Sequence, residues 1–439
     1  MGIKVVKFGG SSVADAIQLK KVKRIIEADP DRKYVVVSAP GKRFDDDSKI
    51  TDLLYLCKTH IDNNLTPTHV FQVICDRYRM MELNLGLDAE THLDAELEKI
   101  RANLKPGVTA DYIASRGEYL CGILTAAVLG YDFVDPAGLI CFDERGRYLP
   151  EQTDSRLSAE LAKHERAVIP GFYGSSKDGS IRTFTRGGSD ITGSLVAKAV
   201  NADIYENWTD VSGFLMADPR IVPEAQPIKN ITYKELRELS YMGASVLHED
   251  AVFPVREANI PINIRNTNEP DNPGTVISDT PKGSKEHIIT GIAGRRDFAV
   301  ITLYKNMMNA EVGFVKRLLT ILENNEIPFE HLPTGIDTVS VIISRKELDG
   351  RLQDLLDDIE RRLNPDSVEV YQDLALIATV GVGMTRRLGV CATLFGALNE
   401  AGVNVRMIDQ GSSEMNIIIG VDNENFETAI KAIYGAFVK

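Results

Sequence analysis

The sequence contains no long apolar run, and this absence already limits the class of protein. No stretch approaches the roughly 18 uninterrupted apolar residues of a membrane-spanning helix. The apolar segment IKVVKF at residues 3–8 is too short for the core of a signal peptide and is followed by a polar helix pattern. We therefore expect a cytoplasmic protein without membrane helices or a membrane partner.

Cysteine is scarce as well. The 439 residues include five cysteines, at positions 57, 75, 121, 141 and 391, and no two of them form a C-x-x-C pair. An odd number without paired spacing does not indicate a disulfide framework and is typical of a reducing compartment. The candidate sites considered below include no metal centre built from protein ligands.

Positive charge is in deficit, with 50 Lys and Arg against 63 Asp and Glu, a net charge of −13. A nucleic-acid surface needs basic clusters, so no nucleic-acid partner is expected. An acidic substrate is not excluded, because local charge at a site can oppose the total. Two familiar nucleotide motifs are also missing, G-x-x-x-x-G-K-[ST] and a G-x-G-x-x-G after a strand. Any nucleotide must therefore be bound by another route.

What the sequence does contain is an alternation of short apolar strands with amphipathic helices. Ile50, Leu53, Leu54, Cys57 and Ile61, for example, follow the spacing of one helix face. This alternation predicts a mainly parallel sheet with helices on both faces. Strands are expected at 3–8, 34–37, 167–172, 183–185 and 203–208, and helices around 50–61, 86–103, 111–129, 155–163, 190–201 and 232–243.

The chain is too long for one core, and turn residues from about residue 270 predict a domain boundary. An internal repeat follows. EVGFVKRLLTILENNEIPFEHL at 311–332 resembles RLGVCATLFGALNEAGVNVRMI at 387–408, at an offset of 76 residues, and strands are expected before and after both. The order strand, helix, strand, strand, helix predicts a ferredoxin-like unit that occurs twice.

The segment KFGGSS, residues 7–12, joins the first expected strand to a helix. Its glycines allow backbone N–H groups to approach a ligand, and the helix presents its positive N-terminus, which suits phosphate. Lys7 supplies a mobile positive charge for oxygens that gain charge in phosphoryl transfer. The same pattern also occurs in simple tight turns, and that alternative stays open.

A second Gly-Gly loop enters another helix in TRGGSDITGSL, residues 185–195. Arg186 offers a planar fork to a carboxylate or phosphate, whereas Ser189 and Asp190 are equally suited to helix capping. A third loop, NWTDVSGFLMADPR at 207–220, mixes donors with acids as nucleotide binding requires, although its Asp-Pro pair is also common in turns. Two Gly-Gly loops at two helix N-termini suggest one loop on each side of a transferred phosphoryl group.

Taken in order, several segments closely resemble the aspartokinase family, and the doubled C-terminal unit resembles the tandem ACT regulatory modules of these enzymes. The segments are KFGGSSVAD (7–15), VVVSAP (35–40), SRGEYL (115–120), TRGGSDITGSL (185–195), WTDVSGFLMADPR (208–220) and GASVLH (243–248). The resemblance covers nearly the whole chain. It implies an α/β catalytic domain with the three-layer α/β/α amino acid kinase fold over 1–280. It further implies two ferredoxin-like α+β ACT modules, one over 296–368 and one over 288–294 plus 369–439.

The resemblance also implies the reaction, in which MgATP phosphorylates the β-carboxylate of L-aspartate to give 4-phospho-L-aspartate and ADP. This is the first step of lysine, threonine and methionine biosynthesis. A carboxylate is already a nucleophile at neutral pH, so catalysis requires positioning and charge neutralisation rather than a general base. The residues matching the family's catalytic and binding residues are Lys7 and Asp190 for catalysis, Ser38, Thr51, Glu118, Arg186 and Ser189 for the substrate, and Lys7, Gly9, Gly10, Ser11, Thr209, Asp210, Asp218 and Arg220 for ATP.

By this correspondence Arg186 pairs with the α-carboxylate of the substrate, and Glu118, with Asp190 nearby, meets the α-amino group. From the residues alone an exposed helical glutamate is usually solvated, so Glu118 would not stand out. Ser245 departs from the family, because many relatives have a lysine there that faces the nucleotide phosphates. Mg²⁺ or another basic side chain must then cover that charge. The charged stretch 41–48 fits a solvated loop better than a mobile flap.

ACT modules of this family pair side by side and bind an amino acid at their interface, commonly lysine or threonine. Pairing of sheet edges implies a homodimer or homotetramer. Two acids among the effector-facing positions favour L-lysine over L-threonine, unless they are simply exposed charges. These positions are Met308, Glu311, Phe314, Val315, Phe329, Glu330 and Thr334. No dinucleotide-binding unit follows the repeat in this sequence, so we expect no fused homoserine dehydrogenase.

Two other interpretations remain. A glutamate 5-kinase relative would have the same fold, but those enzymes typically lack tandem ACT modules. Ser245 raises a second alternative, an amino-acid-sensing binding protein whose kinase half is inactive, and ATP turnover would distinguish it from an enzyme. The kinase half retains several residues that match the family's catalytic and binding residues, which argues against a loss of activity. These residues are Lys7, Arg186, Asp190, Asp210 and Arg220.

Overall fold

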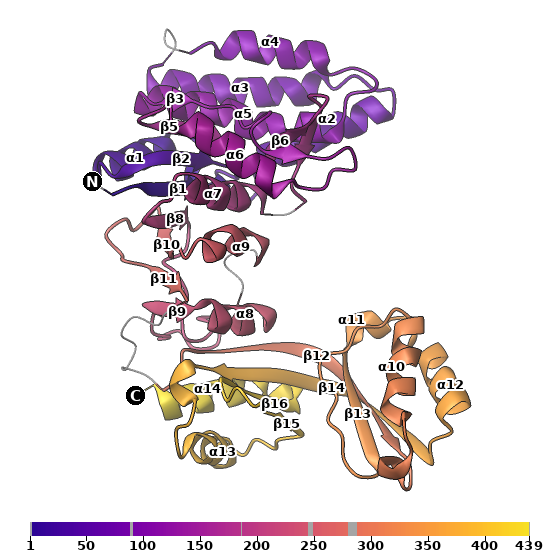
Figure 1. Ribbon diagram of the computed structural model, residues 1–439. Helices are drawn as coiled ribbons and strands as arrows, with labels where there is room; N and C mark the ends of the chain where they lie inside the picture. Colours follow the sequence, from indigo (N-terminus) through magenta and orange to yellow (C-terminus); the bar gives the residue numbers. More distant parts are fainter. Residues whose placement is uncertain (1, 88–90, 186, 245–248, 280–287, 439) are drawn as a thin grey trace. The chain divides into compact units, whose positions relative to one another are not determined.

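The computed structural model describes residues 2–87, 91–185, 187–244, 249–279 and 288–438, which form two compact units (Figure 1). The first unit comprises residues 1–214, 227–233 and 246–282, and the second comprises 215–226, 234–245 and 283–439. Within the described ranges, no helix is both long and apolar enough to cross a membrane.

The first unit is built around an eight-stranded sheet with the order β3-β5-β2-β1-β8-β10-β11-β9. From β3 to β10 every neighbouring pair is parallel, as expected when a helix connects one strand to the next. A small sheet, β4-β6-β7, lies in the same unit. The strands are β1 (Lys4–Phe8), β2 (Arg32–Val37), β3 (Asp132–Phe133), β4 (Cys141–Phe142), β5 (Ala167–Pro170), β6 (Tyr173–Ser176), β7 (Ile181–Thr183), β8 (Ile204–Thr209), β9 (Asn230–Thr232), β10 (Ile262–Asn266) and β11 (Thr275–Ser278).

Helices cover both faces of the large sheet, which gives the predicted three layers. Alternate strand residues such as Val6 and Phe8 join one apolar core with the first five helices. The opposite face presents Lys7, Tyr205 and Asn207 toward α7, which packs beside α6 and α9. The helices of this unit are α1 (Ala16–Glu27), α2 (Ile50–Asp62), α3 (Thr68–Leu85), α4 (Leu93–Asn103), α5 (Ala110–Leu129), α6 (Pro150–Leu161), α7 (Gly188–Ala199) and α9 (Glu249–Glu257). Helix α8 (Tyr233–Tyr241) belongs to the second unit except for its first residue.

The second unit contains a five-stranded sheet with the order β13-β12-β14-β16-β15. Its strands are β12 (Gly291–Tyr304), β13 (Thr338–Ser344), β14 (Ser367–Val380), β15 (Met407–Asp409) and β16 (Asn416–Asp422). Its helices are α10 (Phe314–Asn324), α11 (Arg345–Leu348), α12 (Leu352–Leu363), α13 (Val390–Glu400) and α14 (Phe426–Phe437). Helices α10 and α13 begin and end 76 residues apart, as the internal repeat predicts.

The two repeats share their central strands. Residues 298–304 of β12 pair with 367–374 of β14, and residues 291–295 pair with 376–380 further along the same ladder, with irregular register between the two stretches. One continuous pair of strands therefore serves both repeats, as the long strands in Figure 1 illustrate. The segment expected at 288–294 contributes its strand residues to the second repeat.

Some sequence-based expectations were wrong in detail. Helix α3 was not predicted, the helix expected over 86–103 begins only at Leu93, and the strand expected at 183–185 spans Ile181–Thr183. The predicted domain bounds, 1–280 for the catalytic domain, stay a prediction. The two compact units are a different division, in which residues 215–226 and 234–245 belong with the C-terminal unit. Their hydrogen bonds to that unit, described below, account for this division.

Candidate active site

The carboxyl ends of three neighbouring parallel strands form the edge where the predicted site residues gather. The register places Lys7 of β1 opposite Val36 of β2 and also opposite Asn207 of β8. Because parallel strands end at the same edge of a sheet, the loops that follow these strands emerge on one side. Two of them, after Phe8 and Thr209, carry predicted ATP-side residues.

Lys7 forms the central ion pair of this edge. Its side chain is 8% exposed, and its Nζ lies 2.5 Å from Oδ1 of Asp190, the third residue of α7. The side-chain amide of Asn207 donates to the same carboxylate oxygen at 2.7 Å. Two strands and the second Gly-Gly loop thus meet at one carboxylate. Sequence reasoning did not single out Asn207, although two adjacent polar residues, Glu206 and Asn207, inside a central strand were the available signal.

The first Gly-Gly loop packs tightly against the loop after β2. The Gly41 amide donates to the carbonyl oxygen of Gly10 at 2.8 Å, and the Gly9 amide donates to that of Trp208 at 3.0 Å. A Cβ atom on Gly10 would lie 2.9 Å from the carbonyl oxygen of Ala39, closer than side chains tolerate. Glycine is therefore required at this position by packing, whether or not a phosphate binds there.

Glu118 lies in α5 and is buried, with 5% of the residue exposed. The backbone N–H of Ala39 donates to its carboxylate, whereas Oε2 has no hydrogen-bond partner among the described residues. Burial raises the pKa of Glu118 to about 8. A buried carboxylate with an open oxygen suits a cationic ligand group such as an ammonium. The general expectation of a solvated helical glutamate fails here because α5 is buried around most of its circumference.

The three hydroxyl residues predicted for the substrate lie around the end of β2. Ser38 follows the strand directly. Ser189 is buried against Gly171, the residue after β5, so closely that a Cβ on the glycine would lie 2.6 Å from that of the serine. Thr51 is the second residue of α2, and the amide of the first residue donates to the carbonyl oxygen of Pro40 at 3.1 Å.

The residues predicted on the nucleotide side are divided between the two units. In the first unit, Ser11 lies in a 3-10 turn after β1, and Thr209 donates through Oγ1 to Oδ1 of Asp210 at 3.2 Å. In the second unit, Asp218 and Arg220 form an ion pair of 2.6 Å. That the residues of both units bind the same nucleotide stays a prediction.

Arg186, predicted to bind the α-carboxylate, lies outside the described residues, as does Ser245. Where side chains are described, no group of three or more His, Cys, Asp or Glu is arranged to hold a metal ion. Mg²⁺ at phosphoryl-transfer sites needs only one or two carboxylates besides the phosphates. Asp210 is an exposed carboxylate at the end of β8. The residues present therefore fit a metal that arrives with a nucleotide.

Arg77, in the unpredicted helix α3, anchors the charged stretch 41–48 and was missed by sequence reasoning. Its guanidinium donates to the carbonyl oxygens of Ser48 at 2.8 Å, of Ala14 at 3.1 Å and of Gly41. Asp47 lies 3.5 Å from its Nη1. This buried arginine thus fastens the loop after β2 to the segment after the first Gly-Gly loop. The described side chains of 41–48 are otherwise mostly exposed, as expected for a solvated loop.

Asp47 is fixed from the other side by Arg43. Nε and Nη2 of Arg43 donate to the two carboxylate oxygens at 2.7 and 2.9 Å. Hydrogen bonding to Arg43, with a further contribution from the charge of Arg77, holds the pKa of Asp47 well below its usual range. The stretch 41–48 is therefore held in place by the ion pairs of Asp47 with Arg43 and Arg77, and most of its side chains are exposed to solvent.

The positions predicted for an effector lie in the second unit and differ in exposure. Met308 and Phe314 belong to the apolar core of the first repeat. Val315 is half-buried, Phe329 and Thr334 are exposed, and Glu311 is exposed and paired with Arg317. Glu330 is half-buried, accepts a hydrogen bond from the Tyr241 hydroxyl and lies 3.5 Å from Nη1 of Arg295.

Comparison with known proteins identifies both parts of the chain. A model of the amino acid kinase family matches residues 2–266, and a model of the ACT domain matches residues 377–437. The chain is 39% identical over 457 residues to aspartokinase 3 of Bacillus subtilis strain 168, with 99% of this chain and 98% of that protein covered.

Solved structures agree with these matches. The aspartate kinase of Clostridium acetobutylicum is 50% identical and superposes with a TM-score of 0.92 over 100% of both chains. Aspartokinase III of E. coli is 26% identical. Its complex with aspartate and ADP gives a TM-score of 0.73 over 99% of both chains, and its complex with lysine and aspartate gives 0.75 over 100% of both.

Replacing Glu118 with glutamine should change how stability depends on pH. The folded wild-type protein holds a proton on Glu118 up to about pH 8, whereas the unfolded chain releases it near 4.5, the ordinary pKa of a glutamate. Between these values the folded state binds more protons, so this group makes the free energy of unfolding fall as pH rises. In Glu118→Gln that contribution disappears. Urea unfolding between about pH 5 and 9 should show the variant gaining stability relative to wild type; parallel curves would contradict the raised pKa.

Replacing Arg77 with methionine should cost about 3–5 kcal/mol of unfolding free energy, because three carbonyl groups and a buried carboxylate lose a shared charged partner. Arg43→Met removes an exposed partner of the same carboxylate and should cost clearly less. Chemical denaturation at neutral pH measures both variants. Equal losses would mean that Arg77 does not anchor this loop.

Proposed function

The chain belongs to the aspartokinase family, and from that premise we propose that it transfers the γ-phosphoryl group of ATP to the β-carboxylate of L-aspartate. The products are 4-phospho-L-aspartate and ADP. The observation that carries this proposal in the structure is the pairing of Lys7 with Asp190 at the carboxyl edge of β1, where both Gly-Gly loops begin or end. The E. coli relative solved with aspartate and ADP supports the choice of substrates.

Lys7 is the residue we assign to charge neutralisation. Its ammonium group is held by Asp190 and lies close to Gly9 of the first Gly-Gly loop, since a Cβ on that glycine would be 3.6 Å from Nζ. Charge develops on the phosphoryl oxygens during transfer, and a preorganised cation in a largely buried setting stabilises it. Asp190 and Asn207 fix the position of the ammonium group. Neither has to accept a proton, because the substrate carboxylate is already ionised.

Glu118 is the residue we assign to the α-amino group of aspartate. In the protein without substrate its carboxyl group is largely protonated at neutral pH, because its pKa is about 8. An ammonium ion beside it favours the ionised form, so substrate binding releases a proton from this residue. Ser38, Thr51 and Ser189 supply hydroxyl groups around the same strand end. Arg186, outside the described residues, remains the predicted partner of the α-carboxylate.

Mg²⁺, when bound with ATP, supplies further neutralisation of the phosphate charge, and Asp210 is the described residue best placed by exposure to contact it. Thr209 and Asp210 in the first unit and Asp218 and Arg220 in the second are assigned to the nucleotide by family correspondence alone.

The ACT repeat makes this an allosterically regulated enzyme, and we assign L-lysine as the effector. Support comes from Glu311 and Glu330 among the predicted effector positions and from the E. coli relative solved with lysine. L-threonine is the alternative effector. Pairing of the repeats between copies would give a homodimer or homotetramer. The cytoplasmic location predicted from cysteine usage is consistent with five free thiols.

Turnover can be tested directly with MgATP and L-aspartate, trapping the acyl phosphate with hydroxylamine. Wild-type protein should form aspartyl hydroxamate, and Lys7→Ala should lower kcat by at least about 10²-fold because it loses the preorganised cation. Lys23→Ala, an exposed lysine on α1, is the matched control and should keep wild-type turnover. No hydroxamate from folded wild-type protein would refute the enzyme and favour an amino-acid sensor.

The effector can be tested in the same assay. L-lysine should inhibit hydroxamate formation, and Glu330→Gln should raise the half-inhibitory concentration by about tenfold or more, since a charged partner of the lysine ammonium is lost. Glu323→Gln, an exposed acid on α10, should respond like wild type. Inhibition by L-threonine but not L-lysine would overturn the assignment of the effector.

A further inference from the structure

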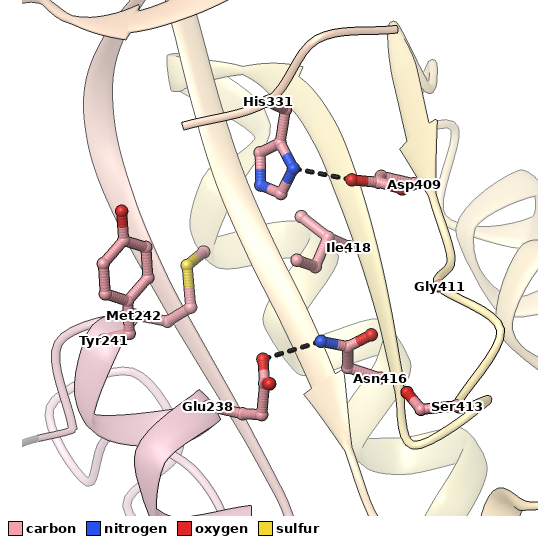
Figure 2. A pocket seen from close by; sticks show the side chains of 9 residues that line it. All are labelled: Glu238, Tyr241, Met242, His331, Asp409, Gly411, Ser413, Asn416 and Ile418. Atoms are coloured by element: carbon pink, nitrogen blue, oxygen red, sulfur yellow. Dashed lines mark hydrogen bonds and ion pairs between the residues drawn. The ribbon is translucent and has the colours of Figure 1, made fainter. Parts of the chain in front are cut away.

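A cavity of about 270 Å³ lies inside the second unit, among three of its segments (Figure 2). Residues of α8 form one wall, His331 of the first repeat forms a second, and residues 409–418 of the second repeat close it. None of the lining residues belongs to the positions predicted for the effector, although Glu330 precedes His331 in sequence. The lining residue Tyr241 donates a hydrogen bond to Glu330, so the cavity adjoins one predicted effector position without including it.

The cavity has a polar group at each end and an apolar middle. At one end His331 and Asp409 are joined through Nδ1 and Oδ2 at 2.6 Å, and at the other the Asn416 amide donates to Oε2 of Glu238 at 2.6 Å. Figure 2 shows Ile418 between these two pairs. The ligand that matches this pattern carries charged groups of both signs on a short apolar body.

The two ends differ in charge. Asp409 already faces an imidazole, which is cationic when protonated, whereas the partner of Glu238 in this cavity is a neutral amide. A carboxylate has acceptor sites for several hydrogen bonds, so Glu238 can bind an ammonium group in addition to Asn416. The hydrogen-bonding groups of His331 at the other end suit a carboxylate.

The volume of the cavity limits the size of the ligand. Water occupies roughly 30 Å³ per molecule in the liquid, so the cavity has room for about nine non-hydrogen atoms. That is the size of a single amino acid and far below that of a nucleotide. Met242 and Ile418 give the middle of the cavity an apolar lining, which disfavours a second charged group on the ligand.

We propose that this cavity is a second amino-acid site, which binds a free L-amino acid with a short uncharged side chain, its ammonium group on Glu238 and its carboxylate toward His331. The site includes none of the predicted effector positions and goes beyond the proposed catalytic function.

The contacts of α8 connect this cavity to other parts of the regulatory unit. Glu235 of the same helix accepts hydrogen bonds from the Thr290 hydroxyl at 2.6 Å and from the Val382 amide at 2.8 Å, so α8 is tied to the regulatory unit along its length. In sequence, residues 234–245 lie between two segments of the first unit. A ligand that binds this arrangement stabilises it by mass action, increasingly as the ligand concentration exceeds the Kd.

Calorimetric titration of the full-length protein tests the proposal, with L-methionine, L-threonine and L-valine as probes and saturating L-lysine present to fill the predicted effector site. At least one probe should bind, and its D-enantiomer should not. Glu238→Gln should weaken that binding by about 10- to 100-fold, because a charged hydrogen bond to the ammonium is lost. Met242→Trp keeps Glu238 but fills the cavity, and it should abolish binding.

Glu424→Gln, the same substitution at an exposed carboxylate outside the cavity, is the matched control and should leave binding unchanged. Thermal unfolding of each variant verifies that the regulatory unit is folded. The proposal is overturned if none of the three probes binds, or if a probe binds Met242→Trp and Glu238→Gln as tightly as wild type.

Discussion

The parallel register of β2, β1 and β8 is the constraint on which the candidate site depends. Because Lys7 lies opposite both Val36 and Asn207, the loops that follow the three strands begin next to one another at the same edge of the sheet. The alternation of side chains along β1 then turns Lys7 toward α7, where Asp190 binds it. A register shift of one residue would turn Lys7 into the apolar core around Phe8 and separate it from Asp190.

Burial acts in opposite ways on the two charged groups that matter most for ligands. Lys7 has an oppositely charged partner within hydrogen-bonding distance, so its ammonium group is stabilised in a largely buried position. Glu118 has no such partner among the described residues, and burial raises its pKa to about 8 instead. The site is thus prepared for an anion at one group and for a cation at the other. Aspartate bound for phosphorylation presents both kinds of charge.

The sequence predicted the parts of the molecule whose signals are local. The strand before KFGGSS and the helix face from Ile50 to Ile61 depend on short-range patterns, and the 76-residue repeat depends on direct similarity of two segments; each is found in the structure. Arg77 could not be predicted, because its three carbonyl partners come from segments 29 to 63 residues away. The burial of Glu118 likewise depends on packing around α5, and the shared strands β12 and β14 depend on pairing between repeats.

The division of the chain into two units shows why regulation need not depend on a single linker. Residues 215–226 and 234–245 belong to the second unit although segments of the first unit precede, separate and follow them. Hydrogen bonds such as Met216 N–H to Gln226 carbonyl, Ile292 N–H to Met216 carbonyl and Tyr241 hydroxyl to Glu330 fix these two segments within the regulatory unit. The chain therefore passes between the units five times. The ends of both segments continue into parts of the first unit that contain β8, β9 and α9. Regulation through the ACT repeat therefore has several covalent connections to the first unit and not a single linker.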